Sequence, residues 1–131
     1  MKVTIYEPPR TKKNSMQIVK AHGHYILIPS KQYKGYEKAC GEYLEGVVDE
    51  PISTPVNVKC EFYMPTKRKV DISNLISAVH DVLVHYGVLA DDNRDVIGSV
   101  DGSRVWYDKD NPRTEITITR YEGEYETWKQ K

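Results

Sequence analysis

Apolar residues recur at helical spacing in the middle of the chain, between Asn74 and Tyr86. They fall three, four and seven positions apart, which places them on one face of an α-helix: Leu75, Ile76, Val79, Val82, Leu83 and Tyr86. Polar residues occupy a different face: Asn74, Ser77, Asp81 and His85. Gly87 follows at the position where a glycine commonly ends a helix. The pattern predicts an amphipathic helix closed at Gly87, then a short buried strand or turn at 88–90.

Two further patterns predict the elements that pack with this helix. Residues 56–64 alternate between apolar and polar, which is typical of a strand with one covered face. Their inward positions are Val56, Val58, Cys60, Phe62 and Met64. Ser30 can cap a second helix. The apolar stripe of that helix consists of Tyr33, Tyr36, Cys40, Tyr43, Leu44 and Val47.

The remaining apolar runs predict short strands at both ends of the chain. One covers 3–6, and two more at 16–20 and 25–28 form a hairpin with Gly23 in its turn. After the central helix come 96–100, 104–107 and 114–119; we expect the last two to pair as a hairpin through the polar turn 108–112. Together these elements predict one α+β domain over 1–131, a single-layer mixed or antiparallel sheet covered by two helices. Residues 122–131 are expected to be a frayed tail.

The composition is that of an intracellular soluble protein, with 39% hydrophobic and 29% charged residues. No leader peptide and no apolar run of membrane-spanning length is visible, so we expect no membrane partner and a cytoplasmic location. Cys40 and Cys60 have no metal-ligand spacing and are expected to be buried thiols in a reducing compartment.

Charge is divided unevenly along the chain although its net charge is zero. Residues 1–70 carry 12 Lys and Arg against 7 Asp and Glu, whereas residues 71–131 carry 7 against 12. A basic half and an acidic half suit a surface that binds phosphate and a site that holds a metal ion. Chance segregation of solvated charge explains the same numbers equally well.

The candidate chemistry lies between Lys67 and Asp95. A basic triplet of Lys67, Arg68 and Lys69 precedes Asp71 at the helix start, and Asp91 and Asp92 follow the helix exit. We expect the segment after the helix to fold Asp91 and Asp92 back towards Asp71. Mg²⁺ prefers oxygen ligands and needs only one or two carboxylates when substrate phosphate completes its shell. Asp71 and Asp92 are therefore the candidate magnesium ligands, and Asp91 competes with Asp92.

Each of these residues also has a purely structural interpretation. Asp71 or Ser73 suits a helix N-cap, and the sequence Asp91-Asp92-Asn93 suits a turn. The polar loop 10–15, which contains Lys13 and Asn14, has the residue types that bind phosphate, but such loops are more often merely solvated.

The stretch MPTKRKVDISNLISAVHDVL, followed by GVLADD, resembles the signature of the RusA family of Holliday junction resolvases. In that signature a basic run precedes Asp-x-Asp-Asn-Leu, a helix with an inner Asp, and then Asp-Asp. The resemblance extends more weakly to the Pro8-Pro9 loop with Lys13 and Asn14, to the helix near Tyr33, and to residues 115–118. It implies a RusA-like fold and a homodimeric, magnesium-dependent endonuclease that cuts four-way DNA junctions, as is common in the recombination and repair of phages and prophages.

Matched to the signature, Asp71 takes the place of the first metal-site aspartate and Asp92 that of the last. Asn74 matches the motif asparagine, and Asp81 the inner helix aspartate. The chain departs from the signature where Ser73 replaces the second aspartate and Ser77 replaces a lysine. Asp81 and Asp91 are the carboxylates that can compensate.

We expect Lys13, Asn14, Lys67, Arg68 and Lys69 to contact DNA. We also expect a homodimer, because two sites related by a dyad fit the near two-fold symmetry of a junction. Two alternatives stay open at this point: a branched-DNA binding protein of the same fold that has lost cleavage, and a small globular protein whose acidic residues are caps and turns.

Overall fold

The structure, a computed structural model, describes residues 1–12 and 16–121 of the chain. The predicted frayed tail 122–131, like Lys13 and Asn14, lies outside the described residues. The elements follow in the order β1 (Lys2–Ile5), β2 (Met16–Ala21), β3 (His24–Pro29), α1 (Lys31–Leu44), β4 (Val56–Met64), α2 (Ile72–His85), β5 (Ile97–Ser99), β6 (Arg104–Tyr107) and β7 (Arg113–Arg120). No helix in the described ranges is both long and apolar enough to cross a bilayer.

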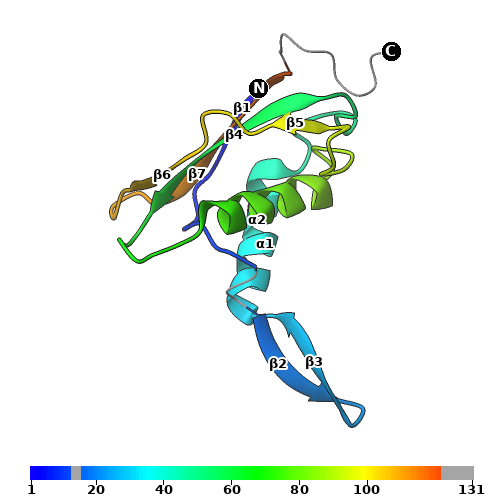
Figure 1. Ribbon diagram of the computed structural model, residues 1–131, viewed down its shortest axis with the longest axis vertical. Coiled ribbons are helices and arrows are strands. Elements are labelled where there is room, and N and C mark those ends of the chain that lie inside the picture. Colours follow the sequence, from blue (N-terminus) through cyan, green and yellow to red (C-terminus); the bar gives the residue numbers. More distant parts are fainter. Residues whose placement is uncertain (13–15, 122–131) are drawn as a thin grey trace.

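Strand β4 is the central strand of a mixed sheet (Figure 1). On one side it pairs antiparallel with β7, which in turn pairs antiparallel with β1. On its other side it pairs in parallel with β5 near its start and with β6 near its end. Figure 1 shows both helices on the same face of this sheet. The α+β class, with a mixed sheet and two helices, is therefore confirmed.

The hydrophobic core lies between the helices and the inner face of β4. The inward positions predicted for β4 are buried from Val56 to Phe62, and Met64 packs partly buried against them. Leu75, Val79, Val82 and Leu83 of α2 are almost completely buried on the same core. The apolar face of the strand, with its period of two, and that of the helix, with its period of 3.6, thus pack together in one layer.

Both helix ends that the sequence predicted are formed. The Ser30 hydroxyl accepts a hydrogen bond from the Tyr33 backbone N–H at 3.2 Å, which caps α1. At the end of α2, Gly87 has a φ of 72°, a conformation that costs glycine little. The N–H of Gly87 bonds to the Val84 carbonyl, and that of Val88 to the Leu83 carbonyl, which is the Schellman pattern.

The predicted pairing of 104–107 with 114–119 as a hairpin is wrong. Strand β4 lies between β6 and β7 and pairs with both. Neighbouring strands lie about 4.8 Å apart, so a five-residue connection is long enough to pass across the end of one intervening strand. It passes there: the N–H of Asp108 bonds to the Met64 carbonyl at 2.9 Å.

The predicted hairpin around Gly23 is confirmed, but β2 and β3 form a sheet of their own. Figure 1 shows this hairpin extending from the N-terminal end of α1, away from the main sheet. It exposes large apolar side chains: Ile18 (71% exposed), Leu27 (61%), Tyr25 (75%) and Ile26 (44%).

Candidate functional site

Asp71 lies at the N-cap position of α2, yet its carboxylate makes no capping hydrogen bond to the backbone. Instead, Asp71 Oδ2 accepts a hydrogen bond from Asn74 Nδ2 at 3.2 Å. The Asp71 side chain is exposed. The backbone of Asp71 therefore begins the helix, as its carbonyl accepts the N–H groups of Asn74 and Leu75. Its carboxylate retains lone pairs for another partner.

The two aspartates after α2 have different surroundings. Asp91 holds the turn together: its Oδ1 accepts the Asp92 backbone N–H at 2.7 Å, and its Oδ2 accepts Asn93 Nδ2 at 3.1 Å. Asp92 is exposed, and within the described chain no hydrogen bond or ion pair to its carboxylate is recorded. The Asp91 carboxylate is thus already used within its turn, whereas the carboxylate of Asp92 has no recorded partner among the described residues.

The position of the Asp91–Asp92 turn is fixed by the buried segment before it. Val88 and Leu89 are completely or almost completely buried, and Leu89 forms a parallel bridge with Ile52. The Ile52 N–H bonds to the Val88 carbonyl, and the Ala90 N–H to the Ile52 carbonyl, each at 2.9 Å. The short buried segment predicted at 88–90 is thus present at Val88 and Leu89, whereas Ala90 is exposed.

His80, on α2, interacts electrostatically with the carboxylates of Asp92 and Asp81. Burial lowers the pKa of His80, while the negative charges of Asp92 and Asp81 act in the opposite direction. Its Nε2 is buried without a hydrogen-bond partner in the described chain. The negative charge of Asp81 adds to the effect of burial in raising the pKa of Tyr33, on α1. The negative charge of Asp92 thus opposes the effect of burial on the pKa of His80, in the second half of α2.

The structure records no contact between Asp71 and either Asp91 or Asp92. Asp71 contacts the first turn of α2, a helix of 14 residues that is about 21 Å long. Among the described residues, no three or more His, Cys, Asp or Glu side chains form a group that could hold a metal ion. The convergence of these aspartates stays a prediction.

Exposed carboxylates free of ion pairs are nevertheless the donor type that fits Mg²⁺, which keeps several waters and needs few protein ligands. Asp71 and Asp92 are both exposed, and no ion pair to either is recorded within residues 1–12 and 16–121. The two departures from the sequence signature, Ser73 and Ser77, are exposed on α2. Neither serine adds a carboxylate or an ammonium group to the helix surface.

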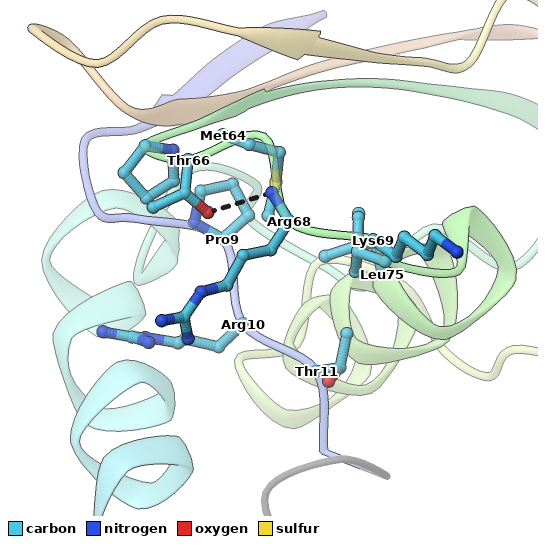
Figure 2. A pocket seen from close by; sticks show the side chains of 10 residues that line it. Pro9, Arg10, Thr11, Met64, Thr66, Arg68, Lys69 and Leu75 are labelled. Atoms are coloured by element: carbon cyan, nitrogen blue, oxygen red, sulfur yellow. Dashed lines mark hydrogen bonds between the residues drawn. The ribbon is translucent and has the colours of Figure 1, made fainter.

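A pocket with a volume of about 300 Å³ lies between the end of β4, the start of α2 and the segment that follows β1 (Figure 2). It is lined by Pro9, Arg10, Thr11, Met64, Pro65, Thr66, Arg68, Lys69, Val70 and Leu75. Arg68 and Lys69 belong to the predicted DNA-binding set. Of the other lining residues, Val70 directly precedes Asp71 and Leu75 follows it by one helical turn. The pocket thus brings the basic loop to the start of the helix that carries Asp71.

Lys67, the third described cation of the basic loop, lies over the ring of Tyr107 with 5.0 Å between its Nζ and the ring centroid. Tyr107 is 49% exposed at the end of β6. An aromatic face beside a basic loop is a combination that single-stranded nucleic acid can use for stacking.

The sequence patterns did not indicate that Arg10 and Tyr107 lie beside the basic loop of Lys67, Arg68 and Lys69. Arg10 was grouped with a polar loop, and only the fold brings it into the lining of the same pocket as Arg68. Tyr107 was treated as a strand residue, and the parallel pairing of β6 with β4 places it opposite Met64. No short-range sequence signal indicates either contact, because both join segments more than 40 residues apart.

Comparison with known families identifies one that covers most of the chain. The family described as endodeoxyribonuclease RusA matches residues 6–119, a range that contains both helices, β4, the basic loop and all three candidate aspartates. No individual curated protein matches the chain. The chain therefore belongs to the RusA family of endodeoxyribonucleases.

Proposed function

We propose that this protein is a magnesium-dependent endonuclease that resolves four-way DNA junctions by paired phosphodiester cuts. The observation that carries the proposal is the exposed Asp71 carboxylate, not used as a helix cap, beside a pocket that contains Arg10, Arg68 and Lys69. Membership of an endodeoxyribonuclease family supplies the reaction class. In this proposal the whole chain acts as one RusA-like domain in the cytoplasm, in recombination or repair.

The residues have distinct parts in the proposed reaction. Asp71 and Asp92 hold the metal ion, and Asn74 keeps the Asp71 carboxylate in one orientation. Magnesium, when bound, supplies Lewis-acid stabilisation of charge on the phosphate and lowers the pKa of a water molecule. Lys67, Arg68 and Lys69, together with Lys13 and Asn14, bind the DNA backbone and so orient the strand.

A synthetic four-way junction with labelled strands tests the proposal. We expect the wild-type protein to bind this junction more tightly than linear duplex of the same sequences and to cut it only when Mg²⁺ is added. Equal affinity for junction and duplex, or cutting that survives chelation of divalent ions, would contradict the proposal.

A second candidate function follows from Ser73, which leaves α2 without the signature's second aspartate. Loss of a carboxylate weakens a magnesium site. The second candidate is therefore a protein that binds branched DNA with little or no cleavage. The same assay separates the two: tight junction binding with no cutting at any Mg²⁺ concentration would favour binding alone. Restoration of cutting by Ser73→Asp would identify the missing ligand.

We further propose that the active unit is a homodimer, and that hairpin β2–β3 is its contact surface. Ile18 and Leu27 are directly paired across the hairpin and are therefore on the same face, where both are exposed. A two-stranded hairpin alone is marginally stable in water, so a cover for this face is expected. A second copy is the favoured cover, because residues 16–29 contain no Asp or Glu and present the same apolar face to a two-fold partner.

A further inference from the structure

The lining of the pocket at the start of α2 is rich in positive charge. Arg10, Arg68 and Lys69 line it, and no Asp or Glu is among its described lining residues. The ion pairs recorded for the described chain involve Lys2, Lys59 and Arg113, and none of the three pocket cations. Like charges held close together repel, so an anion in the pocket would be favourable.

Two guanidinium groups are turned towards the same part of this pocket. Figure 2 shows the side chains of Arg10 and Arg68 approaching each other, while Lys69 extends in the other direction over the start of α2. They come from segments 58 positions apart in the chain, so the fold and not local sequence places them together. A planar guanidinium offers paired N–H donors that match the oxygens of a phosphate.

The fold restrains the Arg10 side chain and the backbone at Arg68. Arg10 lies against Gln32 of α1, and with its amide oxygen facing the guanidinium, Gln32 accepts from Nη1 at 2.8 Å and from Nη2 at 3.2 Å. The Arg68 backbone N–H donates to the Thr66 hydroxyl at 3.4 Å, inside the short loop after β4. Restrained donors lose less conformational entropy on binding an anion than free ones.

We propose that this pocket is a phosphate subsite in which Arg10 and Arg68 together bind one phosphodiester group of the DNA strand. The inference rests on the proposed function and adds to it a defined position for one phosphate. Val70 and Leu75 line the pocket on either side of Asp71 in the chain, so the bound phosphate is a neighbour of the one presented to Asp71. Arg10 thereby acts as a positioning residue for the strand.

The experiment is a double-mutant cycle between protein and DNA. Single phosphates near the cut site are replaced one at a time by neutral methylphosphonate linkages, and junction affinity is measured for wild type, Arg10→Gln and Arg68→Gln. Each variant should bind the unmodified junction about tenfold or more weakly, since hydrogen bonds between charged groups are removed. One linkage should weaken wild-type binding but have no further effect in either variant, and it should be the same linkage for both.

Arg120→Gln is the matched control, because Arg120 is exposed and pairs with Val56, at the end of β4 opposite to the pocket. Its effect should add to that of every methylphosphonate. Thermal unfolding of Arg10→Gln checks that the chain stays folded without the hydrogen bonds between Arg10 and Gln32. Arg68→Gln guards against unfolding as an explanation, since the Arg68 side chain is exposed.

Three results would overturn the inference. The first is additivity of Arg10→Gln with every substituted linkage. The second is that inorganic phosphate stabilises the wild-type protein but not Arg10→Gln, while Arg10→Gln binds DNA as tightly as the wild type does. The pocket would then bind a free anion and not the DNA strand. The third is failure of the wild-type protein to bind four-way DNA, which would remove the proposed function as well. Junction binding and cutting by the wild type with additive Arg10 effects would remove the subsite alone.

Discussion

The side-chain amide of Asn74 donates a hydrogen bond to the Asp71 carboxylate one helical turn earlier, with 3.2 Å between Nδ2 and Oδ2. This contact occupies one oxygen of the carboxylate and restricts its rotation. The Asp71 carboxylate makes no capping hydrogen bond to the backbone. Among the described residues, Asn74 is therefore the hydrogen-bond partner that orients this carboxylate.

Asn74→Ala should therefore weaken metal use without removing the proposed ligand. Loss of a residue that orients a metal ligand typically costs about 10–100-fold in metal affinity or activity. We expect the Mg²⁺ concentration for half-maximal cutting to rise by a factor on the order of that range. Saturating Mg²⁺ should restore most of the rate. Asn111→Ala, at an exposed position in the 108–112 turn, is the control. A rate that stays low at every Mg²⁺ concentration would contradict a purely orienting role.

Asp71→Asn and Asp92→Asn should each reduce cutting by about 100-fold or more, because each removes a charged oxygen ligand. Junction binding should be unchanged or tighter, since a negative charge near the DNA phosphates is removed. Cutting is measured by gel and affinity by anisotropy, with Asp110→Asn as control. A variant that keeps its turnover at limiting Mg²⁺ would exclude that residue as a ligand.

Replacing Lys13, Lys67, Arg68 and Lys69 with glutamine should weaken binding to all DNA sequences alike. Removing one charge that neutralises a phosphate should reduce the slope of log affinity against log salt by roughly 0.9. Affinity titrations between low and physiological salt measure the slope. Lys34 and Lys38, which are exposed on α1, provide a control pair. An unchanged slope after all four replacements would show that these charges are solvated.

Glu115 on the outer sheet face should make stability depend on acid pH. It is bonded to Lys2 at 3.0 Å and to Arg113 at 2.8 Å, and these contacts lower its pKa from the ordinary value of 4.5. The stabilisation is therefore fully present above that value and is lost as the pH falls through the lowered pKa of the folded state. Urea unfolding of wild type and Glu115→Gln should show a difference near neutral pH that closes on acidification. A difference independent of pH would contradict the assignment.

The homodimer should appear in light scattering as a particle of about twice the 15.1 kDa chain mass. Stable interfaces of this kind bury roughly 1,600 Å² in total. Ile18→Lys and Leu27→Lys place a charge on the exposed face of hairpin β2–β3 and should give monomers, whereas Val47→Lys, at another exposed apolar position, should not. A wild-type monomer that still makes paired cuts would contradict the dimer.

Local patterns predicted the elements well because each carries its own period or cap. The alternation in β4, the cap at Ser30 and the glycine ending α2 all depend on residues close in sequence, and all three are present. Val47 was assigned to the first helix, but α1 ends at Leu44 and Val47 is 38% exposed. Helix ends depend on competing backbone partners, which a stripe of apolar residues does not define.

Contacts between distant segments could not be predicted in the same way. The polar residues of the 108–112 turn are compatible with two arrangements: the strands on either side of it pair with each other, or a third strand lies between them. The sequence therefore did not indicate that β6 pairs in parallel with β4. The candidate site shows the same limit. Asp71 and Asp92 were identified by a motif, but a motif says nothing of the separation between them, whereas Arg10 beside Arg68 required the fold.

The β-bridge between Ile52 and Leu89 restricts where residues can be inserted into or deleted from this chain. Ile52 precedes β4 and Asp71 follows it, so the nine residues of β4 act as a spacer between the anchor of the Asp92 turn and the start of α2. An inserted residue in β4 would reverse its buried and exposed faces and lengthen the spacer at once. The 108–112 connection carries no such anchor for the aspartates, and insertions there leave the spacing unchanged. Length changes that nuclease activity tolerates should therefore concentrate in the connections outside 52–92.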